Sequence, residues 1–313
     1  MFKTPILFII FNRLDTAQKV FEKIKEQKPK YLYIASDWPR KNKKWEADIC
    51  KNVREEILKQ IDWDCELKTF FRKENVGPKY GVSWAISWFF DNVDQWIIFE
   101  HDCLPDPSFF GFCETMLEKY KDDKRVMHIS WPCHLLPKFY KENTYIFSHY
   151  EHIWGWATRS RAWKLYDVEM KELDNFIKNK WINFITDNFF TKKVNLQRLK
   201  DTHDWKIDTW DYQWRFCMRI NNWYAIQPLT NLVSNIWFWK DALNTKNDLW
   251  MWNKPTKSID FNHLIHPRNF IIDKKYRICD EKYVQLSFKQ YVAIYLKKIW
   301  IYETIAKLLW YNV

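Results

Sequence analysis

The sequence places two carboxylates and a histidine directly after an apolar run. Glu100-His101-Asp102 follows the run Trp96–Phe99. If the extended backbone of that run continues, alternation puts Glu100 and Asp102 on one face and His101 on the other. Neighbouring carboxylates repel each other unless a cation lies near them, and oxygen-only ligands select a hard ion such as Mg²⁺ or Mn²⁺. The triplet therefore predicts a divalent metal site; the alternative is a solvated acidic turn.

Polar groups also follow three earlier apolar runs. Asn12-Arg13 comes after the first, Asp37 after the second, and Arg72 after the third, with Asn75 and Gly77 close behind it. In open α/β sheets, ligands bind beyond the carboxyl ends of the strands. If these runs are parallel strands, this mixture of arginines and carboxylates predicts a site for an anionic ligand and a cation.

Strand-like and helix-like segments alternate over the first 130 residues. We expect strands at 5–11, 31–36, 67–71, 96–99 and 126–130, and helices at 16–25, 46–61, 80–90 and 109–120. Asp15 and Ser108 are the expected helix caps. This alternation predicts an α/β fold with a mostly parallel sheet flanked by helices. Beyond it we expect mixed elements, with helices near 161–166, 170–188 and 211–220, a loop-like region at about 240–273 and a last helix at 289–310.

The composition narrows the class of protein. With 313 residues, 47% hydrophobic and 28% charged, the chain can bury a sizeable core, which excludes a disordered or collagen-like chain. The seven cysteines form no C-x-x-C pair, and no apolar run approaches the ~20 residues of a membrane-spanning helix. We therefore expect a reduced, cytoplasmic protein.

Three acids in the second half are candidates for a catalytic base. Asp204, Asp208 and Asp211 are spaced i, i+4, i+7, so they would share one face if this segment were helical. The nearby Trp205, Trp210 and Trp214 favour partial burial, which raises the pKa of a carboxylate and makes it a stronger base. The alternative is an exposed acidic stripe.

A second aromatic cluster lies around residues 149–156. Trp154, Gly155 and Trp156 follow His149 and His152, and aromatic rings there would stack on a sugar. An aromatic core strand is an equal alternative. The two histidines lack further partners at zinc spacing, so we do not expect them to bind a metal.

Several of these segments together resemble GT-A-fold glycosyltransferases. They are PILFIIFNRLDTAQKVFEKI, YIASDWPR, FRKENVGPKYGVSWAISWFF and IIFEHDCLPDPSFFGFCETMLEKY, followed by HIWGWATRSRAW, TWDYQW and NLVSNIWF. They look most like a bacterial group of hemolytic-protein-like, nucleotide-diphospho-sugar transferases. The arrangement is also similar to the N-acetylglucosaminyltransferase I family. The resemblance covers roughly residues 4–240.

The resemblance implies a role for each matching residue. Asp102 would hold Mn²⁺ or Mg²⁺ on the diphosphate of the donor, Glu100 would face the ribose or the donor sugar, and Asp37 would contact the nucleoside. Asn12, Arg13 and Arg72 match nucleotide-binding strand ends, and Asp211 matches the catalytic base of an inverting enzyme. His101 stands where the family usually has a second Asp, at a position that concerns contacts with the donor sugar. Trp38 stands where the bacterial group usually has Gly, at a position that concerns the shape of the pocket for the base.

The resemblance also implies how the chain is divided and what activity it has. We expect residues 1–135 to form the nucleotide-sugar-binding half of one GT-A domain, 136–240 its acceptor and catalytic half, and 241–313 a C-terminal extension. The expected activity is transfer of a sugar, with a UDP-sugar as the default donor, to a glycan or lipid-linked acceptor in surface polysaccharide synthesis. The alternatives are a sugar-phosphate nucleotidyltransferase, which usually has a Gly-rich loop where this chain has Asn12–Asp15, and a non-catalytic glycan- or membrane-binding relative.

The net charge of +11 and the basic, aromatic segment at 289–310 raise the question of a further partner. Such a segment suits an anionic membrane surface, nucleic acid, or simple packing on the core. For a sugar transferase, peripheral attachment to the inner face of a membrane is the better functional prediction, and we expect no nucleic acid partner.

Overall fold

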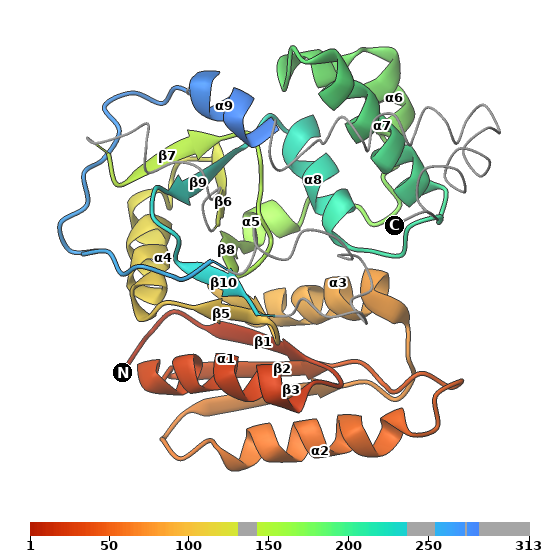
Figure 1. Ribbon diagram of the computed structural model, residues 1–313, viewed down its shortest axis with the longest axis vertical. Coiled ribbons are helices and arrows are strands. Elements are labelled where there is room, and N and C mark those ends of the chain that lie inside the picture. Colours follow the sequence, from red (N-terminus) through yellow and green to blue (C-terminus); the bar gives the residue numbers. More distant parts are fainter. Residues whose placement is uncertain (131–142, 237–253, 273, 282–313) are drawn as a thin grey trace, which may run out of the picture.

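The computed structural model describes residues 1–130, 143–236, 254–272 and 274–281. An eight-stranded sheet with the order β3-β2-β1-β4-β8-β6-β9-β7 runs through it, and helices cover both of its faces (Figure 1). Four of its pairings are parallel (β1 with β2, β2 with β3, β1 with β4, β6 with β9) and three are antiparallel. The α/β class with a mostly parallel sheet and a mixed second half, predicted from the sequence, is confirmed.

The first half alternates strands with helices. Its elements are β1 (Ile6–Ile10), α1 (Leu14–Gln27), β2 (Tyr31–Ser36), α2 (Glu46–Lys59), β3 (Glu66–Phe71), α3 (Gly77–Phe90), β4 (Gln95–Glu100), β5 (Cys103–Pro105) and α4 (Pro107–Lys119). Because β1 to β4 are mutually parallel, their carboxyl ends meet at one edge of the sheet. That edge is the place where ligands bind in open α/β sheets.

The second half adds antiparallel pairings and a group of helices. Its elements are β6 (Val126–Ile129), β7 (Tyr145–Ser148), β8 (Trp156–Arg159), α5 (Ser160–Trp163), α6 (Leu173–Lys178), η2 (Trp181–Phe184), α7 (Phe189–His203), α8 (Asp211–Ile220), β9 (Tyr224–Pro228), β10 (Val233–Asn235) and α9 (Lys274–Asp280). In Figure 1, α6, α7 and α8 gather at the end of the molecule away from α1 and α2.

Strand alternation produces two cores, one on each face of the sheet. In β1, Ile6, Phe8 and Ile10 enter the core covered by α1, α2 and α4, whereas Leu7 and Ile9 enter the core covered by α3, α5 and α8. The second core contains most of the buried tryptophans. A strand that is buried on both faces has a continuous run of apolar residues. For this reason β1 could be predicted from the sequence.

Several local expectations are wrong in detail. The residue preceding α1 is Arg13, and Asp15 lies in the first turn instead of capping it. The carboxylate of Asp106 caps α4 by accepting from the Ser108 backbone N–H. The expected helix at 170–188 is divided into α6 and η2, and α7 was not foreseen.

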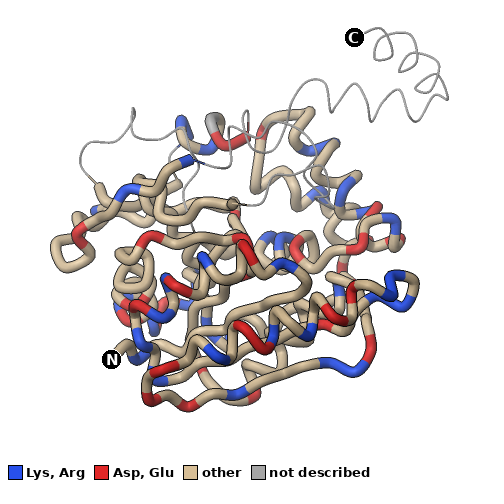
Figure 2. The backbone as a smooth tube through the Cα atoms, turned by 60° about the horizontal axis from the view of Figure 1, so that its bottom comes forward, with Lys and Arg blue, Asp and Glu red and all other residues tan. Residues whose placement is uncertain are grey.

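The described chain contains no helix long and apolar enough to cross a membrane. Lys and Arg are interspersed with Asp and Glu over the described backbone (Figure 2). The predicted helix at 289–310 lies outside the described residues, and the proposed domain boundaries stay predictions.

Candidate functional site

A cavity of about 970 Å³ opens at the carboxyl ends of β1 to β4. Eleven residues singled out in the sequence line it: Asn12, Arg13, Asp37, Arg72, Asn75, Gly77, Glu100, His101, Asp102, Trp154 and Asp211. They come from six separate stretches of the chain, and the parallel register of the first four strands brings most of them together. These residues meet at one edge of the sheet, as their positions after the strands predict.

Asp102 lies in a turn anchored by two short strands. Strand β4 ends at Glu100. The next two residues, His101 and Asp102, form the turn before β5, so the expected extended backbone through the triplet is wrong. The backbone carbonyl of Asp102 accepts a hydrogen bond from the Ile236 N–H at 2.9 Å, just beyond the pairing of β5 with β10. The thiol of Cys103 lies 3.3 Å from Asp102 Oδ1. All three residues of the triplet nevertheless line the cavity.

The acidic side of the cavity combines Glu100, Asp102 and Asp211. Burial raises the pKa of Glu100 to about 8, and the negative charges of Asp102 and Asp211 add to the effect. Burial also lowers the pKa of His101, so this imidazole is neutral near pH 7. The negative charges of Asp102 and Asp211 oppose the ionisation of Glu100, so a cation at this side of the cavity would be stabilising.

Asp211 is the first residue of α8, where the backbone N–H groups favour a negative charge. The hydroxyl of Thr209 donates to Asp211 Oδ1. The predicted helical face of Asp204, Asp208 and Asp211 is wrong, because α7 ends at His203 and α8 begins only at Asp211. Asp204 is on the surface with Lys206, so only Asp211 of the three lines the cavity.

Asp37 ties the ends of β2 and β3 to the start of α3. Its carboxylate accepts hydrogen bonds from the Trp38 N–H at 2.9 Å, the Asn75 side chain at 3.0 Å and the Val76 N–H at 3.1 Å, and Arg72 Nε lies 3.7 Å away. Burial raises its pKa despite these donors. A carboxylate with this many protein partners shapes the cavity wall.

Gly77 allows a second carboxylate to reach the start of α3. Its φ is +74°, and a Cβ there would lie 2.7 Å from Asp208 Oδ2. The other oxygen of Asp208 accepts from the Lys79 N–H at 3.2 Å. Gly77 is therefore required both by its left-handed backbone and by the close approach of Asp208.

The aromatic cluster at 149–156 is divided between the cavity and the core. Trp154 lines the cavity. Trp156 is 1% exposed and stacks on Trp210 at 5.7 Å between ring centroids, and Gly155, with φ +68°, packs against Phe99. Trp156 and Gly155 therefore support the cavity wall from behind, as in the core-strand alternative. His149 and His152 are also outside the cavity lining, stacked on Tyr224 and near Asp280 respectively.

Residues of the loop after β2 also line the cavity and were not singled out as site residues: Arg40, Lys43, Trp45 and Ile49. Ile207, Thr209, Trp210 and Tyr212 line it next to Asp211. The sequence contains a signal for the first group, since four of the five residues from Arg40 to Lys44 are basic and they follow Asp37 by three positions.

A divalent ion would depend on Asp102 and on ligand oxygens. Among the residues that the structure describes, no three or more His, Cys, Asp or Glu side chains are grouped as a metal site. A hard ion that keeps waters and bridges phosphates needs only one or two carboxylates, so the acidic side of the cavity fits Mg²⁺ or Mn²⁺ on a bound diphosphate.

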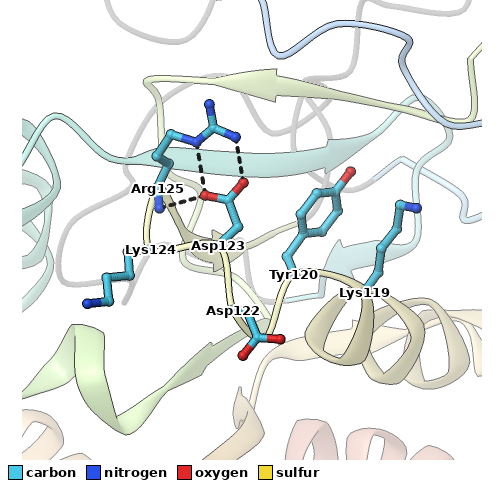
Figure 3. A pocket seen from close by; sticks show the side chains of 6 residues that line it. All are labelled: Lys119, Tyr120, Asp122, Asp123, Lys124 and Arg125. Atoms are coloured by element: carbon cyan, nitrogen blue, oxygen red, sulfur yellow. Dashed lines mark hydrogen bonds and ion pairs between the residues drawn. The ribbon is translucent and has the colours of Figure 1, made fainter.

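A second, open depression lies in the loop between α4 and β6, at the sheet edge opposite the cavity. It is lined by Lys119, Tyr120, Asp122, Asp123, Lys124 and Arg125. In Figure 3 the guanidinium of Arg125 pairs with Asp123, at 2.7 Å between Nη2 and Oδ2. The lining contains three basic and two acidic side chains, and none of them was singled out in the sequence as a site residue.

The chain is similar in fold to solved structures at low sequence identity. No protein-family model and no curated protein matches the chain. Among solved structures, it is similar to the mannosyltransferase PcManGT from Pyrobaculum calidifontis in complex with GDP-Man and Mn²⁺ (13% identity, 52% of this chain and 47% of that one, TM-score 0.36). It is also similar to HddC from Yersinia pseudotuberculosis complexed with GMP-PN (9%, 53% and 80%, TM-score 0.33). A third likeness is the UTP-bound UGPase from Acinetobacter baumannii (7%, 74% and 88%, TM-score 0.36). With TM-scores below 0.5, these likenesses carry no argument about function.

Proposed function

We propose that this protein is a metal-dependent glycosyltransferase of GT-A architecture. It transfers a sugar from a nucleotide-diphosphate donor, with UDP favoured by the family resemblance, to a hydroxyl of a glycan or lipid-linked acceptor. One observation carries the proposal: a single cavity at the carboxyl ends of β1 to β4 has arginines (Arg13, Arg40, Arg72) and carboxylates (Glu100, Asp102, Asp211) in its lining.

The arginines suit the phosphates of the donor. Guanidinium groups bind phosphate oxygens by charge-assisted hydrogen bonds, often two at a time. Asp102 would hold the divalent ion, which when bound supplies positive charge to the departing diphosphate. Trp154, the aromatic member of the 149–156 cluster that lines the cavity, would stack its ring on a sugar.

The proton of the acceptor goes to Asp211. The acceptor hydroxyl oxygen forms a bond to the anomeric carbon as the bond from that carbon to the diphosphate oxygen breaks, and the nucleoside diphosphate leaves with the electron pair. Asp211 Oδ2 takes the hydroxyl proton, while Oδ1 is held by Thr209. Direct displacement of this kind inverts the configuration at the anomeric carbon. A carboxylate within hydrogen-bonding distance of the hydroxyl acts as the general base.

A thermal-shift screen tests the proposal. UDP-, GDP-, CDP- and dTDP-sugars are each added with and without Mn²⁺, because a ligand that binds only the folded chain raises its melting temperature. We expect one nucleotide-sugar to stabilise the chain, and to do so only with the metal. Absence of a shift with every nucleotide would contradict the proposal. Conversion of a nucleoside triphosphate and a sugar phosphate into a nucleotide-sugar would instead identify a nucleotidyltransferase.

We further propose that residues 289–310, which lie outside the described residues, attach the enzyme to an anionic membrane surface near a lipid-linked acceptor. Lys-rich amphipathic segments bind such surfaces through buried apolar area and through charge. Flotation with phosphatidylserine liposomes is expected for the full chain and not for a chain lacking residues 289–313. Equal flotation of both would contradict this attachment.

A further inference from the structure

The loop after β2 contains a buried carboxylate whose partners belong to the cavity. Glu46, the first residue of α2, is fully buried. It accepts hydrogen bonds from the Arg40 backbone N–H at 2.8 Å, from Arg40 Nε at 3.0 Å and from Asn12 Nδ2 at 2.8 Å, and it also pairs with Arg40 Nη2. Arg40 and Asn12 both line the cavity, and Glu46 does not. One buried group therefore joins the loop after β1 to the loop after β2.

The energetics explain why Glu46 stays charged. Burial alone would raise its pKa, but the hydrogen bonds and charge of Arg40, together with the bond from Asn12, hold the pKa below its usual value. Separating the two charges of a buried pair leaves each of them uncompensated, which is strongly destabilising. The pair is therefore held together in the folded protein. The backbone bonds from Lys43 N–H to Arg40 C=O and from Glu46 N–H to Lys43 C=O complete a folded turn around the pair.

This arrangement leaves part of the Arg40 guanidinium for another anion. Nε and Nη2 bond to Glu46, whereas Nη1 makes no hydrogen bond to a described residue. The side chain is 28% exposed, and its guanidinium carbon lies 5.7 Å from the Phe11 ring centroid, which restricts its position. A fixed guanidinium with a remaining donor is preorganised for a phosphate oxygen.

We propose that Arg40 binds a phosphate group of the ligand and that Glu46 is the positioning residue that holds Arg40 and Asn12 in place. The inference rests on the proposed function, whose donor contains a diphosphate, and it assigns the recognition of that diphosphate in part to the loop after β2. Glu46 acts only through Arg40 and Asn12 and does not touch the ligand.

Isothermal titration calorimetry on the full chain separates this role from a structural one. The probes are UDP and GDP, the nucleosides uridine and guanosine, and inorganic pyrophosphate, each with Mg²⁺. We expect Arg40→Ala to weaken diphosphate and pyrophosphate binding by about 10- to 100-fold, the usual loss for a hydrogen bond between charged groups. Binding of the nucleoside should not change. Arg40→Lys, which keeps the charge without the planar fork, should restore part of the affinity.

The Glu46→Gln variant tests directly whether Glu46 holds Arg40 in place. Removing this carboxylate makes the cavity more positive, which alone would strengthen anion binding. Loss of the fixed Arg40 geometry should nevertheless weaken diphosphate binding, by about 3- to 10-fold, less than the loss of a whole charged hydrogen bond. Stronger diphosphate binding by Glu46→Gln would overturn the positioning role.

Two control variants match these changes outside the cavity. Arg125→Ala removes a cation that is paired with Asp123 at the opposite sheet edge, and it should leave diphosphate affinity unchanged. Glu151→Gln changes another buried carboxylate that is paired with an arginine, Arg215, and thermal melts compare its cost to stability with that of Glu46→Gln. A folded Glu46→Gln chain that loses nucleoside and diphosphate affinity equally would overturn the inference.

The outcomes also separate this inference from the proposed function. Pyrophosphate binding that depends on Arg40, without binding of any nucleotide, would support the inference and contradict the nucleotide-sugar donor. Nucleotide binding that is lost in Arg72→Ala but kept in Arg40→Ala would support the proposed function and overturn the inference. A wild-type chain that binds none of the probes would overturn both.

Discussion

His128 gives a quantitative prediction about the core that supports the cavity. It lies on β6 and is 1% exposed. Its Nδ1 accepts a hydrogen bond from Trp214 Nε1 at 3.2 Å, and its Nε2–H donates to the His152 carbonyl at 3.0 Å. Its ring also stacks on Trp156 at 5.0 Å between centroids, and Trp156 stacks on Trp210 at the cavity. Protonation of Nδ1 would therefore break the bond to Trp214 within the second core.

The expected pH effect follows from the difference between the folded and unfolded states. Burial lowers the pKa of His128 from 6.5 to about 4. At this residue the unfolded chain then binds a proton more readily than the folded chain, so the contribution of His128 to stability falls as the pH drops from about 6.5 to about 4 and stays constant below that. A difference of about 2.5 pKa units corresponds to about 3 kcal/mol of unfolding free energy.

Urea unfolding of the wild-type chain and of His128→Gln at pH 7, 6, 5 and 4 measures this effect. Other groups titrate equally in both chains, so the difference between the two isolates His128. We expect the wild type to lose about 3 kcal/mol relative to the variant between pH 7 and pH 4. His263→Gln is a control of opposite sign, because Asp260 raises the pKa of the exposed His263, so that its stabilisation is lost as the pH rises. A constant difference between wild type and His128→Gln over this range would refute the reasoning.

Two further predictions concern the cavity. Gly77→Ala should lower the unfolding free energy by about 2–3 kcal/mol, because Ala is strained at φ +74° and would displace Asp208 from the start of α3. Gly81→Ala, where φ is not positive and the new Cβ would lie 3.2 Å from Asp37 Oδ2, should cost less than ~1 kcal/mol, and equal losses in urea unfolding would contradict this account. Asp211→Asn should reduce turnover by at least about 100-fold while calorimetry shows an unchanged affinity for the donor; near-normal turnover would remove Asp211 from the role of base.

The first half of the fold could be predicted because its signals are local. β1 is a continuous apolar run, and α2 has buried residues at helical spacing (Cys50, Val53, Ile57). α7 was missed because its apolar residues are few and scattered: only Val194 and Leu199 of its hydrophobic side chains are buried. The three-residue strands β5 and β10 are too short to have a period, although their pairing anchors Asp102.

The site was predictable where strand ends determine it. Asn12, Asp37, Arg72 and Asp102 all follow strands and all line the cavity. The pair of Glu46 with Arg40 was not predictable, because an acid at the start of a helix is usually exposed and nothing local to its sequence signals complete burial. Likewise, the sequence spacing of Trp154 and Trp156 could not show that only the first lies in the cavity lining.

The central claim is that Asp102 holds a divalent ion on the diphosphate of a nucleotide ligand. Electron paramagnetic resonance measures it directly, because the signal of free Mn²⁺ falls when the ion is bound. With the nucleoside diphosphate that stabilises the chain, we expect the wild-type protein to bind about one Mn²⁺, and Asp102→Ala to bind it at least about 10-fold more weakly while remaining folded. Equal binding of Mn²⁺ by the two chains in the presence of nucleotide would contradict the claim.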